Sequence, residues 1–190
     1  MTQLQAARQG IVTEAMRAVA AEERVTPEAV REAVAAGHAV IPLNPAHQGV
    51  KPTGVGRLFS TKINANLGRS PTRSGKGDEL VKLQVALDAG AQFVMDLSVG
   101  TGKGAEEIRA ELRDIRQGML DHSPAPLGTV PIYETISRLD GDIPVMDPAY
   151  LLQVIREQAE QGVDFMTLHA GLLRKHLPLT DGRKMGIVSR

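Results

Sequence analysis

The spacing of hydrophobic positions changes near residue 38 and divides the chain into two parts. Before that point the sequence carries the signals of helix boundaries. Thr26 is a favourable capping residue, Pro27 suits the first turn of a helix, and Glu28 places a carboxylate near the positive end of the helix dipole. Gly37 then favours the end of that helix. We therefore predict an N-terminal helical segment over residues 1–37 and a second region over residues 38–190.

From residue 38 onward, short apolar runs alternate with amphipathic stretches. Runs that predict strands lie at residues 39–43, 58–63, 93–97, 128–132 and 165–168. Several of them are apolar almost throughout, which is typical of a sheet that is buried on both faces. The final residues, 185–190, resemble one more strand that no helix follows. A natural domain seldom ends within such a unit, so we expect the chain to be part of a longer protein.

The stretches between these runs carry apolar residues at helical spacing. They are Leu80, Leu83 and Leu87; Ile108, Leu112, Ile115 and Met119; and Leu151, Val154 and Ile155. Asp147 caps the last of these helices, and Gly90 and Gly162 stand where helices are predicted to end. Strand and helix therefore alternate, which predicts an α/β fold with a parallel sheet. Periodicity does not separate a doubly wound open sheet from a (β/α) barrel.

Composition and charge restrict the possible classes of function, although they say little about the fold. The chain has 22 basic and 22 acidic residues and no net charge, so nothing indicates binding to nucleic acid or to an anionic membrane surface. No stretch approaches the roughly 20 apolar residues that span a bilayer, and no signal peptide is recognisable, so we expect a cytoplasmic protein. Recognition of a small molecule is favoured. The sequence contains no cysteine, which excludes a cysteine-ligated cluster within these 190 residues.

Polar residues follow the apolar runs at a similar phase in each unit. They are Asn64 and Asn66, Asp96 and Ser98, Tyr133, His169, and Ser189 with Arg190. In parallel α/β folds the ligand lies beyond the carboxyl ends of the strands, so these groups together predict one binding site. Taken singly, each residue is better explained as a helix cap or as a partner for a loop backbone group.

Two local features leave other chemistry open. His169 could act as a general base, a metal ligand or a donor to an anion, although a single histidine beside apolar residues is more often a hydrogen-bonded core residue. The run Gly100-Thr101-Gly102-Lys103-Gly104 resembles a phosphate-binding loop. It lacks the Ser or Thr after the lysine and the earlier glycine that a P-loop requires, so a surface loop is the better interpretation.

Several longer blocks of sequence are similar to one enzyme family. The blocks cover residues 7–13, 40–42, 62–68, 94–98, 124–133, 157–165, 167–171 and 186–190. Ordered blocks at compatible separations are far more specific than any single short motif. On these residues the chain resembles the phosphomethylpyrimidine synthase family, in the short form that lacks a long N-terminal extension. The resemblance covers nearly the whole chain.

The resemblance implies a (β/α) barrel of the TIM type that rearranges 5-aminoimidazole ribotide into the phosphorylated pyrimidine precursor of thiamine. We therefore expect a partial barrel of about five parallel strands, preceded by N-terminal helices. The resemblance also implies a role in binding the ribotide for six residues: Asn66, Met95, Tyr133, His169, Ser189 and Arg190. Consecutive right-handed βα units bring successive strand ends side by side, so we also expect Asn66, Tyr133 and His169 to converge at the carboxyl ends of adjacent strands.

The family uses a 4Fe–4S cluster, S-adenosylmethionine and a further metal, zinc, and the complete enzyme is expected to be a homodimer. The family's cluster-binding cysteines and metal-binding histidines do not occur in these 190 residues. We therefore expect this chain alone to hold no cofactor, to catalyse no rearrangement, and to be poorly soluble or to associate through its open edge. The sister enzyme that makes 5-hydroxybenzimidazole from the same ribotide, and a non-catalytic ribotide-binding fragment, stay open as alternatives.

Overall fold

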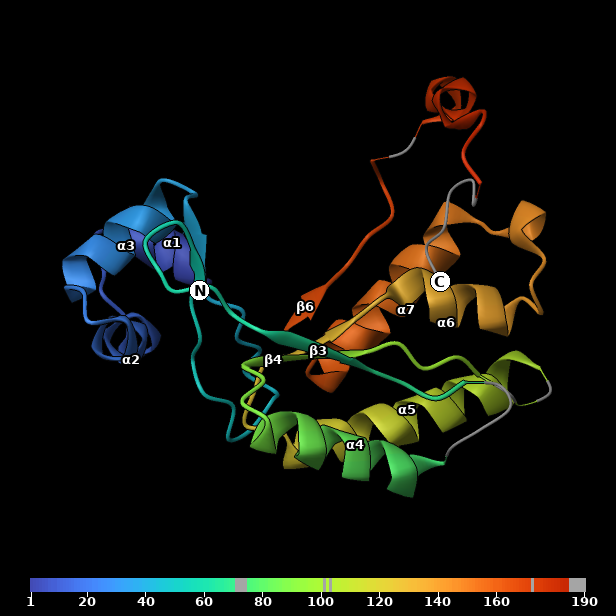
Figure 1. The fold of residues 1–190 in the computed structure, drawn as a ribbon, viewed down its shortest axis with the longest axis horizontal. Coiled ribbons are helices and arrows are strands. Elements are labelled where there is room, and N and C mark those ends of the chain that lie inside the picture. Colours follow the sequence, from blue (N-terminus) through green and yellow to red (C-terminus); the bar gives the residue numbers. More distant parts are fainter. Residues whose placement is uncertain (71–74, 101, 103, 172, 185–190) are drawn as a thin grey trace.

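The computed structural model describes residues 1–70, 75–100, 102, 104–171 and 173–184 (Figure 1). The predicted final strand at 185–190, and with it Ser189 and Arg190, lies outside the described residues. Three helices form an N-terminal unit at one side of the molecule: α1 (Gln3–Arg8), α2 (Glu14–Glu23) and α3 (Pro27–Ala35). The predicted cap is confirmed, because the Thr26 hydroxyl accepts the Ala29 N–H at 3.2 Å and Pro27 begins α3.

The first predicted strand belongs to this N-terminal unit and not to the parallel sheet. Only Ala39–Val40 forms a strand, β1, and it pairs antiparallel with β2 (Val55–Gly56). Ala39 and Ile41 are buried in one apolar cluster with Met16 and Val30, so the run packs on the helices that precede it. The prediction of a parallel strand at 39–43 was therefore wrong.

A parallel sheet of four strands forms the second part of the described chain. It comprises β3 (Asn64–Leu67), β4 (Phe93–Asp96), β5 (Leu127–Thr129) and β6 (Phe165–Met166). The spatial order β3-β4-β5-β6 is also the chain order, and every neighbouring pair is parallel. The predicted α/β fold with a parallel sheet is confirmed.

The predicted strand at 58–63 was placed too early in the chain. The Lys62 ammonium donates to Glu23 and to the Ser60 carbonyl, which holds this stretch against α2 in irregular backbone. The strand begins only at Asn64, so Asn64 and Asn66 lie within β3 and not after it.

Four helices connect and cover the strands: α4 (Lys76–Asp88), α5 (Ala105–His122), α6 (Pro131–Arg138) and α7 (Pro148–Gln161). Two short 3-10 helices follow α6 and β6: η1 (Ile143–Val145) and η2 (Arg174–Thr180). The predicted helical stripes are confirmed, since Leu83, Ile115 and Met119 pack with Val94 and Leu127 of the sheet. In the described part of the chain, we find no helix with the length and apolar character needed to cross a membrane.

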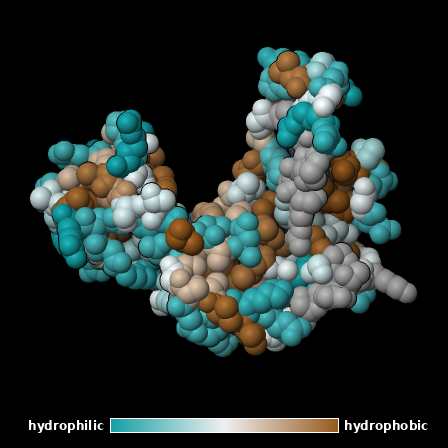
Figure 2. All heavy atoms as spheres, in the orientation of Figure 1, coloured by the Kyte–Doolittle hydropathy of each residue, from teal (hydrophilic) through white to brown (hydrophobic). Residues whose placement is uncertain are grey.

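The helices cover one face of the sheet. Val94 and Leu127, which are register partners, point into the helix layer, where α4 and α5 lie side by side (Figure 1). Residues one position away along each strand point to the opposite face. On that opposite face the surface is hollowed between the N-terminal unit and the projecting segment after β6 that carries η2. Apolar side chains line part of this hollow (Figure 2). This face is where a ligand can approach the sheet.

A buried His–Asp pair joins the N-terminal unit to the sheet. His47 Nδ1 lies 2.6 Å from Asp164 Oδ2, and both side chains are fully buried. His47 Nε2 lies 3.0 Å from the Ser123 carbonyl oxygen. The Asp164 carboxylate also accepts the backbone N–H groups of Asn44 and Leu127, at 2.7 and 2.8 Å. Both ring nitrogens therefore face acceptors, which favours the doubly protonated imidazolium.

The His47–Asp164 pair should make stability depend on pH. Burial alone would lower the pKa of His47, but the hydrogen bond and charge of Asp164 and the Ser123 carbonyl outweigh it and raise the pKa above 6.5. Stability from a raised pKa is fully present below 6.5 and is lost as pH rises through the folded value. We expect His47→Gln to cost about 2–4 kcal/mol at pH 6 and less at pH 9, measured by urea unfolding. An equal loss at both pH values would contradict a charged His47.

Candidate functional site

The candidate site lies on the open face of the sheet, toward the carboxyl ends of the strands. Register places Asn66 beside Met95, Met95 beside Gly128, and Gly128 beside Phe165. Register partners in a sheet point to the same face, so these four residues form one row across all four strands. Asn66 and Met95, two of the residues singled out from the sequence, are therefore neighbours.

Glycine in this row makes room for an aromatic ring. A Cβ atom on Gly128 would lie 2.3 Å from two ring carbons of Phe165. The Phe165 ring thus lies directly over β5, and it meets Phe93 edge to face with ring centroids 5.6 Å apart. The two aromatic rings form an apolar floor on the open face, next to Met95.

On the open face, Asn66 and Met95 differ in their exposure to solvent and in the groups that they contact. Asn66 is exposed, and its Oδ1 atom accepts a hydrogen bond from Asn64 Nδ2 at 2.7 Å. Met95 is only 9% exposed, and its sulfur lies 4.0 Å from the Thr167 hydroxyl. Because Thr167 lies two residues before His169, this contact links the Met95 position to the segment that carries the histidine.

Tyr133 and His169 lie against one another. Their ring centroids are 5.9 Å apart, with the ring planes tilted by 42°. His169 is exposed, so in this chain it is not a core histidine. The structure therefore brings together Tyr133 with His169, and Asn66 with Met95, while the Met95–Thr167 contact lies between the two pairs. That these residues bind one ligand stays a prediction.

Tyr133, which contacts His169, belongs to helix α6 and does not lie at the end of a strand. Strand β5 ends at Thr129, and Pro131 opens α6, so the predicted strand at 128–132 was wrong after its second residue. Proline fixes its own φ near the helical value and has no N–H to donate to a strand ladder, which ends the strand and favours the first turn of a helix. Tyr133 is thus the third residue of α6.

The side chains of Asp96 and Ser98 accept hydrogen bonds from backbone N–H groups at the ends of β3 and β4. The Asp96 carboxylate accepts the Ser98 N–H at 2.9 Å, and the Ser98 hydroxyl accepts the Arg69 N–H at 3.0 Å. Asp96 is a register partner of Leu67 and Thr129 on the helix-covered face. Burial raises the pKa of Asp96 in spite of the nearby Arg116 charge. The simpler explanation offered for single strand-end residues is confirmed for this pair.

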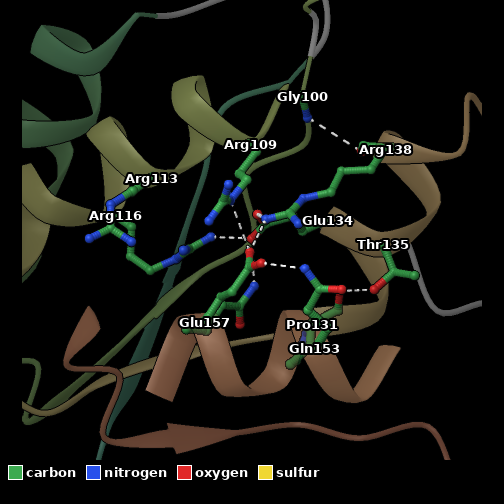
Figure 3. Close-up of polar contacts among 12 residues, drawn as sticks. Gly100, Arg109, Arg113, Arg116, Pro131, Glu134, Thr135, Arg138, Gln153 and Glu157 are labelled. Atoms are coloured by element: carbon green, nitrogen blue, oxygen red, sulfur yellow. Dashed lines mark hydrogen bonds and ion pairs between the residues drawn. The ribbon is translucent and has the colours of Figure 1, made fainter. Parts of the chain in front are cut away.

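A buried cluster of charged residues around Glu134, the residue that follows Tyr133, was not anticipated from the sequence (Figure 3). The Glu134 carboxylate accepts hydrogen bonds from Arg116, from Arg138, and from Gln158 Nε2 at 2.6 Å. Glu157 pairs with Arg138 at 2.8 Å. Burial alone would raise the pKa of Glu157, but hydrogen bonds from Arg138 and Gln153 outweigh it and lower the pKa. Had residues 131–138 been assigned to a helix, the i, i+4 spacing of Glu134 and Arg138 would have indicated this pair.

The residues described here do not fit a cluster or a metal ion. The chain has no cysteine to ligate a 4Fe–4S cluster. Within the described ranges, no group of three or more His, Cys, Asp or Glu side chains could hold a metal ion. The chemistry that this part of the chain can supply is hydrogen bonding, from an amide, a phenol and an imidazole, around an apolar floor.

The fold and the site define an α/β protein with a candidate ligand site at the carboxyl ends of a parallel sheet. Residues 2–190 match the Radical SAM ThiC family, and the chain belongs to this family. The resemblance drawn from the sequence blocks is thereby confirmed. The chain is 53% identical to a phosphomethylpyrimidine synthase of Halobacterium salinarum and 52% identical to those of Natronomonas pharaonis and Haloarcula marismortui. These matches cover 100% of this chain but only 38% of each relative.

Gly68 lets the ends of β3 and β4 approach each other, and we expect Gly68→Ala to destabilise the fold. Its φ of +139° is unfavourable for other residues, and an added Cβ would lie 2.6 Å from backbone atoms of Leu97 and Ser98. The expected loss is about 2–3 kcal/mol in denaturant unfolding. Gly77→Ala is the matched control, because it lies in α4 with open space around it. It should stabilise by about 0.5–1 kcal/mol. Equal effects of the two changes would contradict this account.

Proposed function

We propose that the whole protein acts in thiamine biosynthesis and converts 5-aminoimidazole ribotide into 4-amino-5-hydroxymethyl-2-methylpyrimidine phosphate. The observation that carries this proposal is membership of the Radical SAM ThiC family over residues 2–190, together with relatives named phosphomethylpyrimidine synthase at 52–53% identity. In this proposal the chain supplies the front half of the ribotide pocket.

The roles that we propose follow the chemistry of each side chain. Asn66 offers an amide that both donates and accepts, while Tyr133 and His169 offer a hydroxyl and an imidazole from adjacent units. Met95 lines the pocket beside the apolar floor. Ser189 and Arg190, which lie outside the described residues, are assigned to the phosphate, because a guanidinium fork suits a bidentate phosphate contact.

We propose that the parallel sheet is part of a (β/α) barrel of the TIM type. The helical segment 1–37 lies outside it, and within residues 38–190 the part that carries β3 to β6 contributes to it. Two features support this proposal. The four strands are consecutive in space and in sequence, as in a barrel. The helices α4 and α5 and the cluster they form lie on one face, as the outer helices of a barrel do, which leaves the other face for the barrel interior.

The cofactors of the proposed activity are a 4Fe–4S cluster, S-adenosylmethionine and zinc. When bound, the cluster and S-adenosylmethionine supply the radical chemistry of the family. Because these 190 residues provide no thiolate, we assign the cluster ligands to the rest of the protein. The residues of this chain are assigned to binding and orienting the ribotide. We also propose that the whole protein works in the cytoplasm as a homodimer.

Substitutions at the two paired rings test the site in the whole protein. We expect His169→Ala and Tyr133→Phe to lower ribotide turnover by about 10- to 100-fold, the effect of losing a hydrogen bond to the substrate. Melting temperatures should change little, because His169 is exposed. Turnover is measured anaerobically with the reconstituted cluster and S-adenosylmethionine, with the product identified by mass spectrometry.

Two changes serve as controls for this experiment. Tyr150→Phe alters the other of the two tyrosines, and His122→Ala alters an exposed histidine at the end of α5, in the helix layer. Both should leave turnover unchanged. If His169→Ala and Tyr133→Phe both turned over the ribotide at the wild-type rate, the proposal that these residues bind the ribotide would be wrong. Formation of 5-hydroxybenzimidazole would overturn the proposed product, and tight ribotide binding by the 190-residue chain alone would support the non-catalytic alternative instead.

A further inference from the structure

The position of Tyr133 depends on how α6 is rotated about its axis. The helix has only eight residues and starts two positions after β5. Its N-cap residue, Val130, makes no side-chain hydrogen bond to the first turn. The usual terminal contact that would fix the first turn is therefore missing, and other contacts must orient the Tyr133 ring toward His169.

Glu134, the next residue in the helix, supplies those contacts. Its side chain is 3% exposed and points into the junction of three helices, where it meets Arg116 of α5 and Arg138 of α6 (Figure 3). Both guanidinium groups are buried, and the Nε atoms of both have no partner within the described residues. An uncompensated charge is costly in such a place, so the Glu134 carboxylate is strongly held between them.

Gln158 connects this carboxylate to the strand that ends just before α6. Its Nε2 donates to Glu134 at 2.6 Å, and its Oε1 accepts the Thr129 hydroxyl at 2.6 Å. Thr129 is the last residue of β5. Gln158 is 1% exposed and comes from α7, so one buried amide joins the end of a strand to the first turn of the helix that follows.

We propose that Glu134 and Gln158 are positioning residues that hold Tyr133 in place for the ribotide. Consecutive helix residues point about 100° apart, so a fixed direction for Glu134 also fixes the direction of Tyr133. Loosening the network rotates the first turn and moves the phenol away from its contact. This inference rests on the proposed function, since it assumes that Tyr133 contacts the ribotide.

The decisive change is Gln158→Met in the whole protein, which keeps the length of the side chain but removes both hydrogen bonds. We expect the ribotide Kd from isothermal titration to rise roughly tenfold, as is typical when a supporting contact is lost. Affinity for S-adenosylmethionine should stay at the wild-type value. The matched control is Gln84→Met, the same exchange in α4, because Gln84 is exposed and its side chain donates to Asp88 at 2.7 Å, outside this network.

A double-mutant cycle with Tyr133→Ala separates positioning from a general structural role. If Gln158 acts through Tyr133, then Gln158→Met adds no loss of ribotide affinity once Tyr133 is alanine. The same loss in both backgrounds would overturn the inference. So would a lower melting temperature together with a wild-type ribotide Kd. If Gln158→Met does not fold, Thr129→Val removes the hydroxyl from the same network, and the same outcomes apply to it.

The experiment also distinguishes this inference from the proposed site. If Tyr133→Ala alone leaves ribotide affinity unchanged, Tyr133 is not a ligand contact, and both proposals fall. If Tyr133→Ala weakens binding while Gln158→Met and Thr129→Val do not, the site stands and only the positioning role is overturned.

Discussion

Parallel pairing of β3, β4, β5 and β6 is the constraint on which the rest of the structure depends. Parallel strands all end at the same edge of the sheet, and register partners share a face. Val94 and Leu127 therefore both enter the helix layer, whereas Met95 and Gly128 both face the open side. One residue of register shift in β4 would exchange these roles, burying Met95 among the helices and exposing Val94.

Two buried carboxylates connect elements that the backbone ladder does not join. Asp164 holds the N-terminal unit through His47 and Asn44, and Glu134 holds three helices through Arg116, Arg138 and Gln158. Removing charges from water is costly, so such groups persist only where several donors satisfy them. Both carboxylates meet at least three donors. Directional contacts of this kind fix orientation, which apolar packing alone specifies poorly.

The sequence predicted best what depends on local spacing. The helical stripes at Leu83 and Ile115 and the cap at Thr26 were confirmed, and so was the parallel order of the strands. Strand limits were less accurate, because tertiary contacts decide them: Glu23 keeps Lys62 out of β3, and Pro131 converts the end of an apolar run into a helix. The Glu134 junction joins α5, α6 and α7, so local spacing could indicate only its Glu134–Arg138 pair and not the contacts with Arg116 and Gln158. Tyr133 was identified both from the strand-end pattern and by resemblance, but its place in a helix was not predicted.

The agreement between chain order and spatial order also bears on how the protein assembles during synthesis. Each new strand can pair with the one made just before it, so β3, β4 and β5 can associate while the ribosome is still adding residues. The bond between His47 and Asp164 is different, because it spans 117 positions in the chain. His47 is synthesised early, whereas its buried partner Asp164 is added only just before β6. Until Asp164 has been made, this link between the N-terminal unit and the growing sheet cannot form, and the His47 imidazole lacks its buried partner.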